Sequence, residues 1–240
     1  MSAFLTIAGV SKRFRGLLAV DRVSCEVTRG EIFAVIGPNG AGKTTLFSMI
    51  AGALKPEDGE IGFLGERIDA LRPDEICRRG IARTFQIVRP FPALTVEDNI
   101  MIGALLRTSD TTRAAATAND VMRQLDLFDK RARIASSLTL PDRKRLEVAR
   151  ALATAPQLLL LDEVMAGLRP TETDRIVSIL RELNAQGLTI LLIEHVMRAV
   201  MALASRVLVL HHGAAIALGT PQDVVREPAV IESYLGAEAI

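Results

Sequence analysis

The sequence predicts an α/β protein with a mainly parallel sheet, and three features support this prediction. Short apolar runs typical of buried strands occur at Ile32–Ile36, Leu158–Leu161, Thr189–Ile193 and Arg206–Leu210. Helical patterns separate the later runs, and this alternation is typical of parallel strands with helices on both faces of the sheet. The chain has 240 residues, of which 49% are hydrophobic and 24% charged, a composition typical of a folded protein.

An antiparallel β subdomain is predicted in the N-terminal third of the chain. Apolar and polar residues alternate over Val23–Val27 and again around Ile61 and Phe63, which is the period of half-buried strands. Turns are expected at Arg29–Gly30 and Asp58–Gly59, where a polar residue precedes glycine.

A helical lobe is predicted in the middle of the chain, at about residues 87–155. Within it, the polar, alanine-rich stretch Thr108–Asp120 is expected to form an exposed turn or helix tip. Residues 1–86 and 156–240 would then form the core and the β subdomain, within a single domain that spans the whole chain.

The charge balance, apolar runs and cysteines limit the class of protein. The 29 basic and 28 acidic residues give a net charge of +1, so no basic field attracts nucleic acid and no nucleic-acid partner is expected. The longest apolar runs, such as Ile100–Leu106, cover about a third of the ~20 residues that a membrane-spanning helix requires. Cys25 and Cys77 lie far apart and are predicted to be small buried residues in a reducing compartment.

A glycine-rich segment after the first apolar run is the strongest functional motif. It fits the pattern G-x-x-x-x-G-K-[ST] and precedes a helix predicted to run from Lys43 to just before Pro56. Such a loop binds phosphates through backbone N–H groups at a helix N-terminus. Lys43 is expected to reach the β- and γ-phosphates of ATP, Thr44 to bind Mg²⁺ and Thr45 to contact a phosphate. The predicted binding residues are Gly37, Pro38, Asn39, Gly40, Ala41, Gly42, Lys43, Thr44 and Thr45.

Two carboxylates supply the other half of the predicted site. Asp162 and Glu163 follow the run Leu158–Leu161, and ligands of open parallel sheets bind at the carboxyl ends of strands. Asp162 is expected to hold Mg²⁺ through water, and Glu163 to polarise the water that attacks the γ-phosphate. An acidic pair that only caps a strand is less favoured, because the same chain carries a phosphate loop. His195 follows another strand end and is within reach of the same crevice, although a lone histidine is more often structural.

The order of these motifs resembles the nucleotide-binding subunit of an ATP-binding cassette (ABC) transporter over essentially the whole chain. The resemblance implies that Phe14 stacks on adenine, that Gln86 touches Mg²⁺ and links the site to the helical lobe, and that His195 binds the γ-phosphate. It also implies that Glu163 is the catalytic residue of an ATP hydrolase with ATP and Mg²⁺ as cofactors. We therefore expect the ABC type of P-loop NTPase fold.

Four segments resemble, within this family, the ATPase subunits of importers for branched-chain and hydrophobic amino acids. They are Arg83–Gln86, Val88–Phe91, Glu194–Met197 and Ser233–Gly236. The resemblance implies transmembrane permease subunits and, indirectly, a solute-binding protein as partners, and a peripheral position on the cytoplasmic face of the inner membrane. ATPases for urea and amide uptake or for lipopolysaccharide export have similar sequences, so the resemblance leaves the identity of the transported solute open.

One segment departs from the family signature Leu-Ser-Gly-Gly-Gln, which caps the ATP of the opposite cassette in a head-to-tail dimer. The matching residues are Leu138, Thr139, Leu140, Pro141 and Asp142. Pro141 lacks the backbone N–H of the glycine that it replaces, and Arg143 and Lys144 are expected to offset the charge of Asp142. In one interpretation, Thr139 and Asp142 form a capping box that preserves the signature. In the other, one ATP site is weakened, which favours a heterodimer of two different cassettes over a homodimer.

Two further positions depart from the family pattern. Val164 stands where proline usually follows the catalytic glutamate, and this change is expected to be neutral. Arg169 replaces the aspartate or asparagine that hydrogen-bonds across the dimer, which puts communication between the two ATP sites in question.

Two other classes of protein share some of these motifs. A soluble ABC-type protein that acts on nucleic acid or ribosomes usually carries paired cassettes, long coiled coils or zinc insertions, which this sequence does not show. A small-molecule kinase with the same phosphate loop would not account for Gln86, His195 and residues 138–150.

Overall fold

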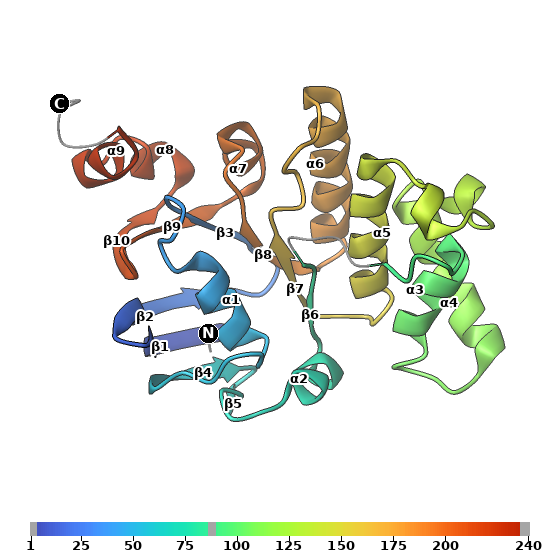
Figure 1. Ribbon diagram of the computed structural model, residues 1–240, viewed down its shortest axis with the longest axis horizontal. Helices are drawn as coiled ribbons and strands as arrows, with labels where there is room; N and C mark the ends of the chain where they lie inside the picture. Colours follow the sequence, from blue (N-terminus) through green and yellow to red (C-terminus); the bar gives the residue numbers. More distant parts are fainter. Residues whose placement is uncertain (1–3, 86–89, 236–240) are drawn as a thin grey trace.

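The computed structural model describes residues 4–85 and 90–235, which form two sheets flanked by helices (Figure 1). The strands are β1 Leu5–Phe14, β2 Leu17–Val27, β3 Ile32–Ile36, β4 Asp58–Phe63, β5 Glu66–Arg67, β6 Ile81–Arg83, β7 Leu158–Asp162, β8 Thr189–Ile193, β9 Arg206–His211 and β10 Ala214–Gly219. The α-helices are α1 Lys43–Ile50, α2 Pro73–Arg79, α3 Val96–Ala104, α4 Thr111–Gln124, α5 Leu140–Leu152, α6 Pro170–Ala185, α7 Met197–Leu203, α8 Pro221–Val224 and α9 Pro228–Leu235. Short 3₁₀ turns at Phe128–Lys130 and Ala135–Ser137 precede α5.

The two sheets have the predicted characters. The larger sheet has the order β10-β9-β3-β8-β7-β6, in which β9, β3, β8, β7 and β6 are parallel and β10 is an antiparallel edge strand. The smaller sheet, in the order β2-β1-β4-β5, is antiparallel throughout. Figure 1 shows it in blue and cyan next to α1, at one end of the molecule.

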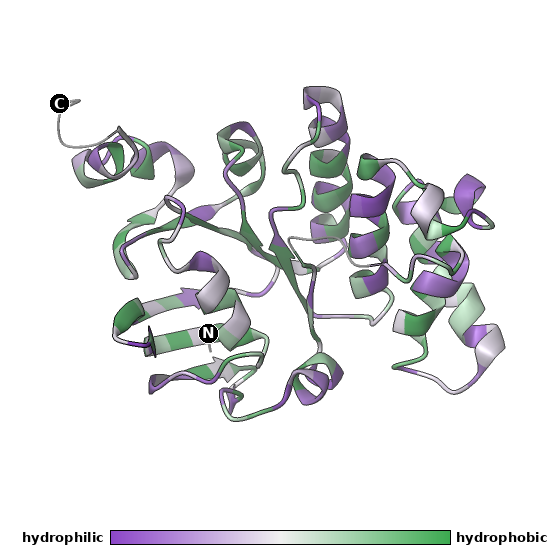
Figure 2. Cartoon of the chain, in the orientation of Figure 1, coloured by the Kyte–Doolittle hydropathy of each residue, from purple (hydrophilic) through white to green (hydrophobic). Residues whose placement is uncertain are grey.

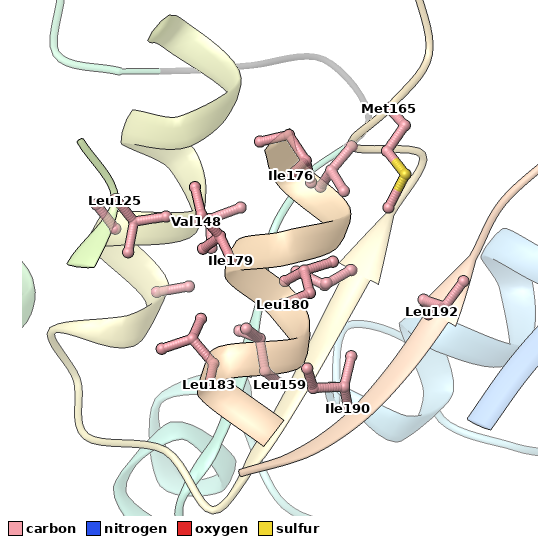
Figure 3. Packing of buried hydrophobic residues seen from close by; sticks show 14 of the residues in the cluster. Leu125, Val148, Leu159, Met165, Ile176, Ile179, Leu180, Leu183, Ile190 and Leu192 are labelled. Atoms are coloured by element: carbon pink, nitrogen blue, oxygen red, sulfur yellow. The ribbon is translucent and has the colours of Figure 1, made fainter. Parts of the chain in front are cut away.

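The parallel sheet has a hydrophobic core on each face, because its strands are buried on both sides. In β3, Ile32, Ala34 and Ile36 belong to the cluster that contains α6, α7 and the middle helices. Phe33 and Val35 belong to the cluster that contains α1 and the antiparallel sheet. Figure 2 shows these strands as a continuous hydrophobic layer, and Figure 3 shows α6 packed between α5 and strands β7 and β8.

The middle of the chain is helical, as predicted, and the stretch Thr108–Asp120 contains the start of a helix rather than only an exposed turn. Helix α4 begins at Thr111, and the carboxylate of Asp110 accepts hydrogen bonds from the first backbone N–H groups of the helix. Ala114 and Ala118 lie one turn apart and are buried. Alanine is the strongest helix former and is small enough for close packing, so a polar, alanine-rich stretch forms a helix here.

Three smaller expectations also differ from the structure. Helix α1 ends at Ile50 rather than near Pro56, because Gly52 follows it with a positive φ of 72° and stops the helix. Asp58–Gly59 begins strand β4 and is not a turn. Cys77 on α2 is only half-buried, unlike Cys25.

In the part of the chain that the structure describes, every helix is too short or too polar to cross a bilayer.

Candidate nucleotide site

The predicted phosphate loop joins β3 to α1 at the carboxyl edge of the parallel sheet. Gly37 has a φ of 145°, and a Cβ atom there would lie 2.1 Å from the backbone oxygen of Leu210. Gly42 has a φ of 100°, and its Cβ would lie 2.3 Å from the backbone oxygen of Ala19. Both positions therefore require glycine, because the loop passes close to the backbone of neighbouring strands.

Lys43 lies across this loop at the start of α1. Its Nζ donates hydrogen bonds to the backbone oxygens of Gly37 at 2.7 Å and Pro38 at 2.9 Å. Burial lowers the pKa of the ammonium, and the negative charges of Glu163 and Asp162 oppose that shift. A phosphate bound in the loop would offer this ammonium negatively charged oxygens in place of the neutral carbonyls. Hydrogen bonds to charged oxygens are stronger than hydrogen bonds to neutral ones.

A cavity of about 220 Å³ lies between the loop and the end of β7. Its lining residues are Ala19, Asn39, Gly40, Ala41, Gly42, Lys43, Thr44, Thr45 and Glu163. The structure thus brings most of the predicted phosphate-binding residues together with the predicted catalytic carboxylate.

A larger hollow of about 430 Å³ lies at the other edge of the parallel sheet. Arg29, Gln157 and Leu188, which precede β3, β7 and β8, are among the residues that line it. These residues mark the amino ends of parallel strands, whereas ligands of such sheets bind at the carboxyl ends. The smaller cavity is therefore the candidate nucleotide site.

Asp162 ends β7 with a carboxylate that is 1% exposed. Its Oδ2 accepts a hydrogen bond from Arg83 Nη2 at 2.8 Å, and Nη1 of the same guanidinium donates to Ser48 Oγ on α1 at 3.0 Å. Within residues 4–85 and 90–235, Oδ1 of Asp162 has no hydrogen-bond partner. A buried carboxylate oxygen without a partner is costly, so this atom suits a cation or the water bound to one.

Glu163 lies beside His195, so the ends of β7 and β8 place the two side chains in one crevice as predicted. The backbone of Glu163 is left-handed, with a φ of 50°, and its N–H donates to the oxygen of Ile193 at 3.0 Å. Its Oε2 is 3.9 Å from Nδ1 of His195, whose ring is more than half exposed. A carboxylate and an imidazole at this edge of the sheet provide groups that accept or donate a proton.

Phe14 is not among the described residues that line the cavity. Phe14 is exposed at the end of β1, with Lys12 Nζ 5.9 Å from its ring centroid, and the paired strand β2 contributes Ala19 to the cavity. Gln86 lies outside the described residues.

The segment that matches the family signature begins helix α5 and lies outside the same cavity. Thr139 is the N-cap residue, and its hydroxyl oxygen accepts the N–H of Asp142 at 3.4 Å. Pro141 lies in the first turn, where a missing N–H costs the helix nothing. Leu138 is buried and Leu140 is exposed. The segment therefore forms a regular helix start. It contains one of the two hydrogen bonds of the predicted capping box, the one from the N–H of Asp142 to the hydroxyl of Thr139.

The carboxylate of Asp142 is neutralised by residues other than the predicted ones. Lys130 Nζ donates to it at 2.6 Å, and Arg145 also pairs with it. The expectation that Arg143 and Lys144 offset this charge is wrong, because both donate to backbone oxygens instead. Lys130 comes from the turn that precedes α5, a contact that sequence spacing does not reveal.

Arg169 and Val164, the two other departures, are accommodated within the chain. The guanidinium of Arg169 pairs with Glu172 in the first turn of α6 at 2.7 Å. Val164 is buried after Glu163.

Three residues near the site have contacts that sequence analysis did not predict: Arg83, Lys144 and Glu194. Oε1 of the buried Glu194 accepts the N–H of Met165 at 2.8 Å, and burial raises the pKa of this carboxyl. Arg83 ends β6, and Glu194 directly follows β8. A charged residue directly after an apolar run could have identified both of them in the sequence as candidate site residues. Lys144 carries no such signal, because its neighbours on α5 are also charged.

Two families of known proteins match parts of this chain. A family described as "ABC transporter" matches residues 20–166, and a family described as "Branched-chain amino acid ATP-binding cassette transporter" matches residues 216–240.

Two curated relatives and one solved structure cover nearly the whole chain. LivG of Salmonella typhimurium, a high-affinity branched-chain amino acid transport ATP-binding protein, is 40% identical over 97% of both chains. BraF of Pseudomonas aeruginosa, whose description is the same, is 37% identical over the same shares. The ADP conformation of an ATP-binding cassette from an ABC transporter is 31% identical, with a TM-score of 0.90 over 98% of this chain and 100% of that chain. The chain therefore belongs to the ABC transporter ATPases, in the family of branched-chain amino acid transport ATP-binding proteins.

Proposed function

We propose that the chain is the ATP-hydrolysing subunit of an ABC importer for branched-chain or other hydrophobic amino acids. The observation that carries this proposal is the cavity in which Glu163 meets the phosphate loop. The likeness to LivG and BraF over nearly the full length supports the solute class. In this proposal Glu163 polarises the attacking water, Lys43 and His195 bind the γ-phosphate, and Phe14 stacks on adenine.

The residues at the site fit a magnesium ion. Asp162 has a buried oxygen without a partner among the described residues, and Thr44 lines the cavity with a hydroxyl. Carboxylate and hydroxyl oxygens suit Mg²⁺, and Gln86 is the third proposed ligand. When bound, the ion would neutralise charge on the phosphates. Arg83 holds the other oxygen of Asp162 and so fixes the carboxylate.

Two cassettes are proposed to close head to tail on ATP. The signature segment lies outside the cavity of its own chain, and Leu140 in it is exposed, which suits a role at the nucleotide of a second cassette. Pro141 offers no N–H to that nucleotide, which favours a heterodimer with a different cassette. A homodimer is the alternative.

Permease subunits are the proposed membrane partners, with the chain bound peripherally at the cytoplasmic face. A groove of about 280 Å³ is lined in part by Phe85 and Ile102, which are 53% and 43% exposed. Phe85 directly precedes Gln86 in the sequence. We propose that movement passes from the nucleotide site through Gln86 and the segment around Ile87–Leu94 to the permease. Exposed apolar side chains in a groove are typical of a protein contact site.

Replacing Ile102 with aspartate is expected to uncouple transport from hydrolysis. Ile102→Asp places a charge in an apolar contact, where it loses water, so ATP-driven uptake by the assembled transporter should fall by about tenfold or more. The basal ATPase rate of the chain should stay within about twofold, since a surface change leaves the core intact. Leu64→Asp is the matched control, because Leu64 is 42% exposed in the turn between β4 and β5. Equal uptake by the two variants would contradict docking at this groove.

The proposed function is tested by reconstituting the chain with its permease and solute-binding partners in vesicles. We expect ATP-driven uptake of labelled leucine, competed by isoleucine and valine and absent with Lys43→Met. Uptake of urea or short amides in place of leucine would contradict the solute. A chain that fractionates with membranes equally well without the permease would contradict the proposed partnership.

A further inference from the structure

A buried lysine on α5 contacts the backbone of the catalytic turn. Lys144 follows the signature segment on the same helix and is 5% exposed. Its Nζ donates a hydrogen bond to the backbone oxygen of Glu163 at 2.9 Å. Burial lowers the pKa of this ammonium, and the negative charges of Glu194, Glu163, Asp162 and Glu147 oppose that shift. Lys144 does not line the nucleotide cavity, so contact with the phosphates does not account for its burial.

The backbone of Glu163 needs external support. Its φ of 50° lies in the left-handed region, which non-glycine residues adopt only when surrounding contacts hold them there. The end of β8 holds its N–H through the oxygen of Ile193. Helix α5 holds its carbonyl through Lys144. The peptide groups on both sides of the catalytic side chain are thus fixed by two different elements.

We propose that Lys144 is a positioning residue for ATP hydrolysis, which ties the helix that carries the signature segment to the backbone of Glu163. This inference rests on the proposed catalytic function of Glu163. Helix α5 begins with the segment proposed to meet the nucleotide of a second cassette, and Lys144 lies little more than one turn from Thr139. A shift of α5 would therefore move the carboxylate that acts on the nucleotide of this chain.

The inference predicts a specific kinetic defect. Loss of the Lys144 ammonium frees the carbonyl of Glu163 and lets the left-handed turn relax, so the carboxylate leaves its working position. A misplacement of about 1 Å is enough to lower a catalysed rate by about a hundredfold. Lys43 donates its hydrogen bonds to the phosphate loop, whereas Lys144 donates to Glu163, so nucleotide binding should persist without the Lys144 ammonium.

The test compares three variants in the assembled transporter: Lys144→Met, Lys144→Arg and Arg181→Met. Methionine keeps most of the length of the lysine side chain but has no hydrogen-bond donor, and arginine keeps the charge and the donors. Arg181→Met is the matched control, because Arg181 Nη2 donates to the backbone oxygen of Ala202 at 2.6 Å, on helices that carry no proposed site residue. For each variant we would measure kcat and KM for ATP, the Kd for ATP and the Tm.

We expect Lys144→Met to lower kcat between about tenfold and a hundredfold, with KM and Kd within about twofold of the original values. Lys144→Arg should recover most of kcat, and Arg181→Met should leave it unchanged. A kcat for Lys144→Met within twofold of that of Arg181→Met would overturn the inference. So would a parallel loss of ATP affinity and Tm that arginine does not rescue, since that pattern marks a structural role alone. Absence of hydrolysis in the unsubstituted transporter would instead overturn the proposed function.

Discussion

Glu163→Gln is expected to lower the rate of ATP hydrolysis by about 10²- to 10⁴-fold while leaving ATP bound. Glutamine has nearly the same shape but does not take up a proton, and removal of a general base costs a factor of this size. Lys43 and the backbone of the loop, which are proposed to hold the phosphates, stay unchanged. The measurements are phosphate release and titration with a fluorescent ATP analogue.

Glu182→Gln is the matched control for this prediction, because Glu182 is an exposed glutamate on α6 that accepts a hydrogen bond from Ser178 and carries no proposed function. It should hydrolyse ATP at the original rate. Hydrolysis by Glu163→Gln at the same rate as the control would show that Glu163 is not the catalytic base.

Glu163→Gln also tests whether the signature segment of this chain works, because two cassettes should stay closed on ATP when hydrolysis is blocked. Sedimentation with and without ATP separates the two interpretations of Pro141. A shift to the mass of a dimer would mean that α5 serves as a signature despite Pro141 and that two copies form working sites. A monomer that still binds ATP would mean that a different cassette completes the site.

The local parts of this fold and site could be predicted from sequence because each depends on neighbouring residues. A buried strand runs directly into the loop at Gly37, and β7 runs directly into Asp162, so strand, turn and functional group are continuous in the chain. The rule that ligands bind at the carboxyl ends of parallel strands then brings Glu163 and the loop together. His195 follows from the same rule at the end of β8.

The features that could not be predicted from the sequence depend on contacts between segments that are far apart in the chain. Arg83 and Asp162 are 79 residues apart in sequence, and their ion pair exists only because β6 and β7 are neighbours in the sheet. In the sequence, Lys144 is one of several charged residues of a helix and is not distinguished from them. Its contact with Glu163 depends on the packing of α5 against the end of β7. Strand β10 was missed because Ala214–Gly219 is weakly apolar and becomes a strand by pairing with β9.

Gly37→Ala is expected to lower both stability and ATP binding, because the new Cβ atom would lie 2.1 Å from the backbone oxygen of Leu210. Since that oxygen belongs to β9, which pairs with β3, relief of the clash requires the two strands to separate where the loop begins. Overpacking against fixed backbone and a left-handed alanine together cost about 3 kcal/mol or more.

Gly187→Ala separates the clash in Gly37→Ala from the strain of a left-handed alanine. Gly187 has a φ of 96° after α6, and nothing lies within 4 Å of its Cβ position, so only the strain of about 1 kcal/mol remains. Because 1 kcal/mol shifts the Tm of a chain of this size by about 2–4 °C, Gly37→Ala should melt about 4–8 °C below Gly187→Ala. It should also lose ATP affinity, which Gly187→Ala should keep. Equal melting temperatures would mean that the loop does not pass as close to β9 as the structure shows, and that Gly37 is required for its backbone conformation alone.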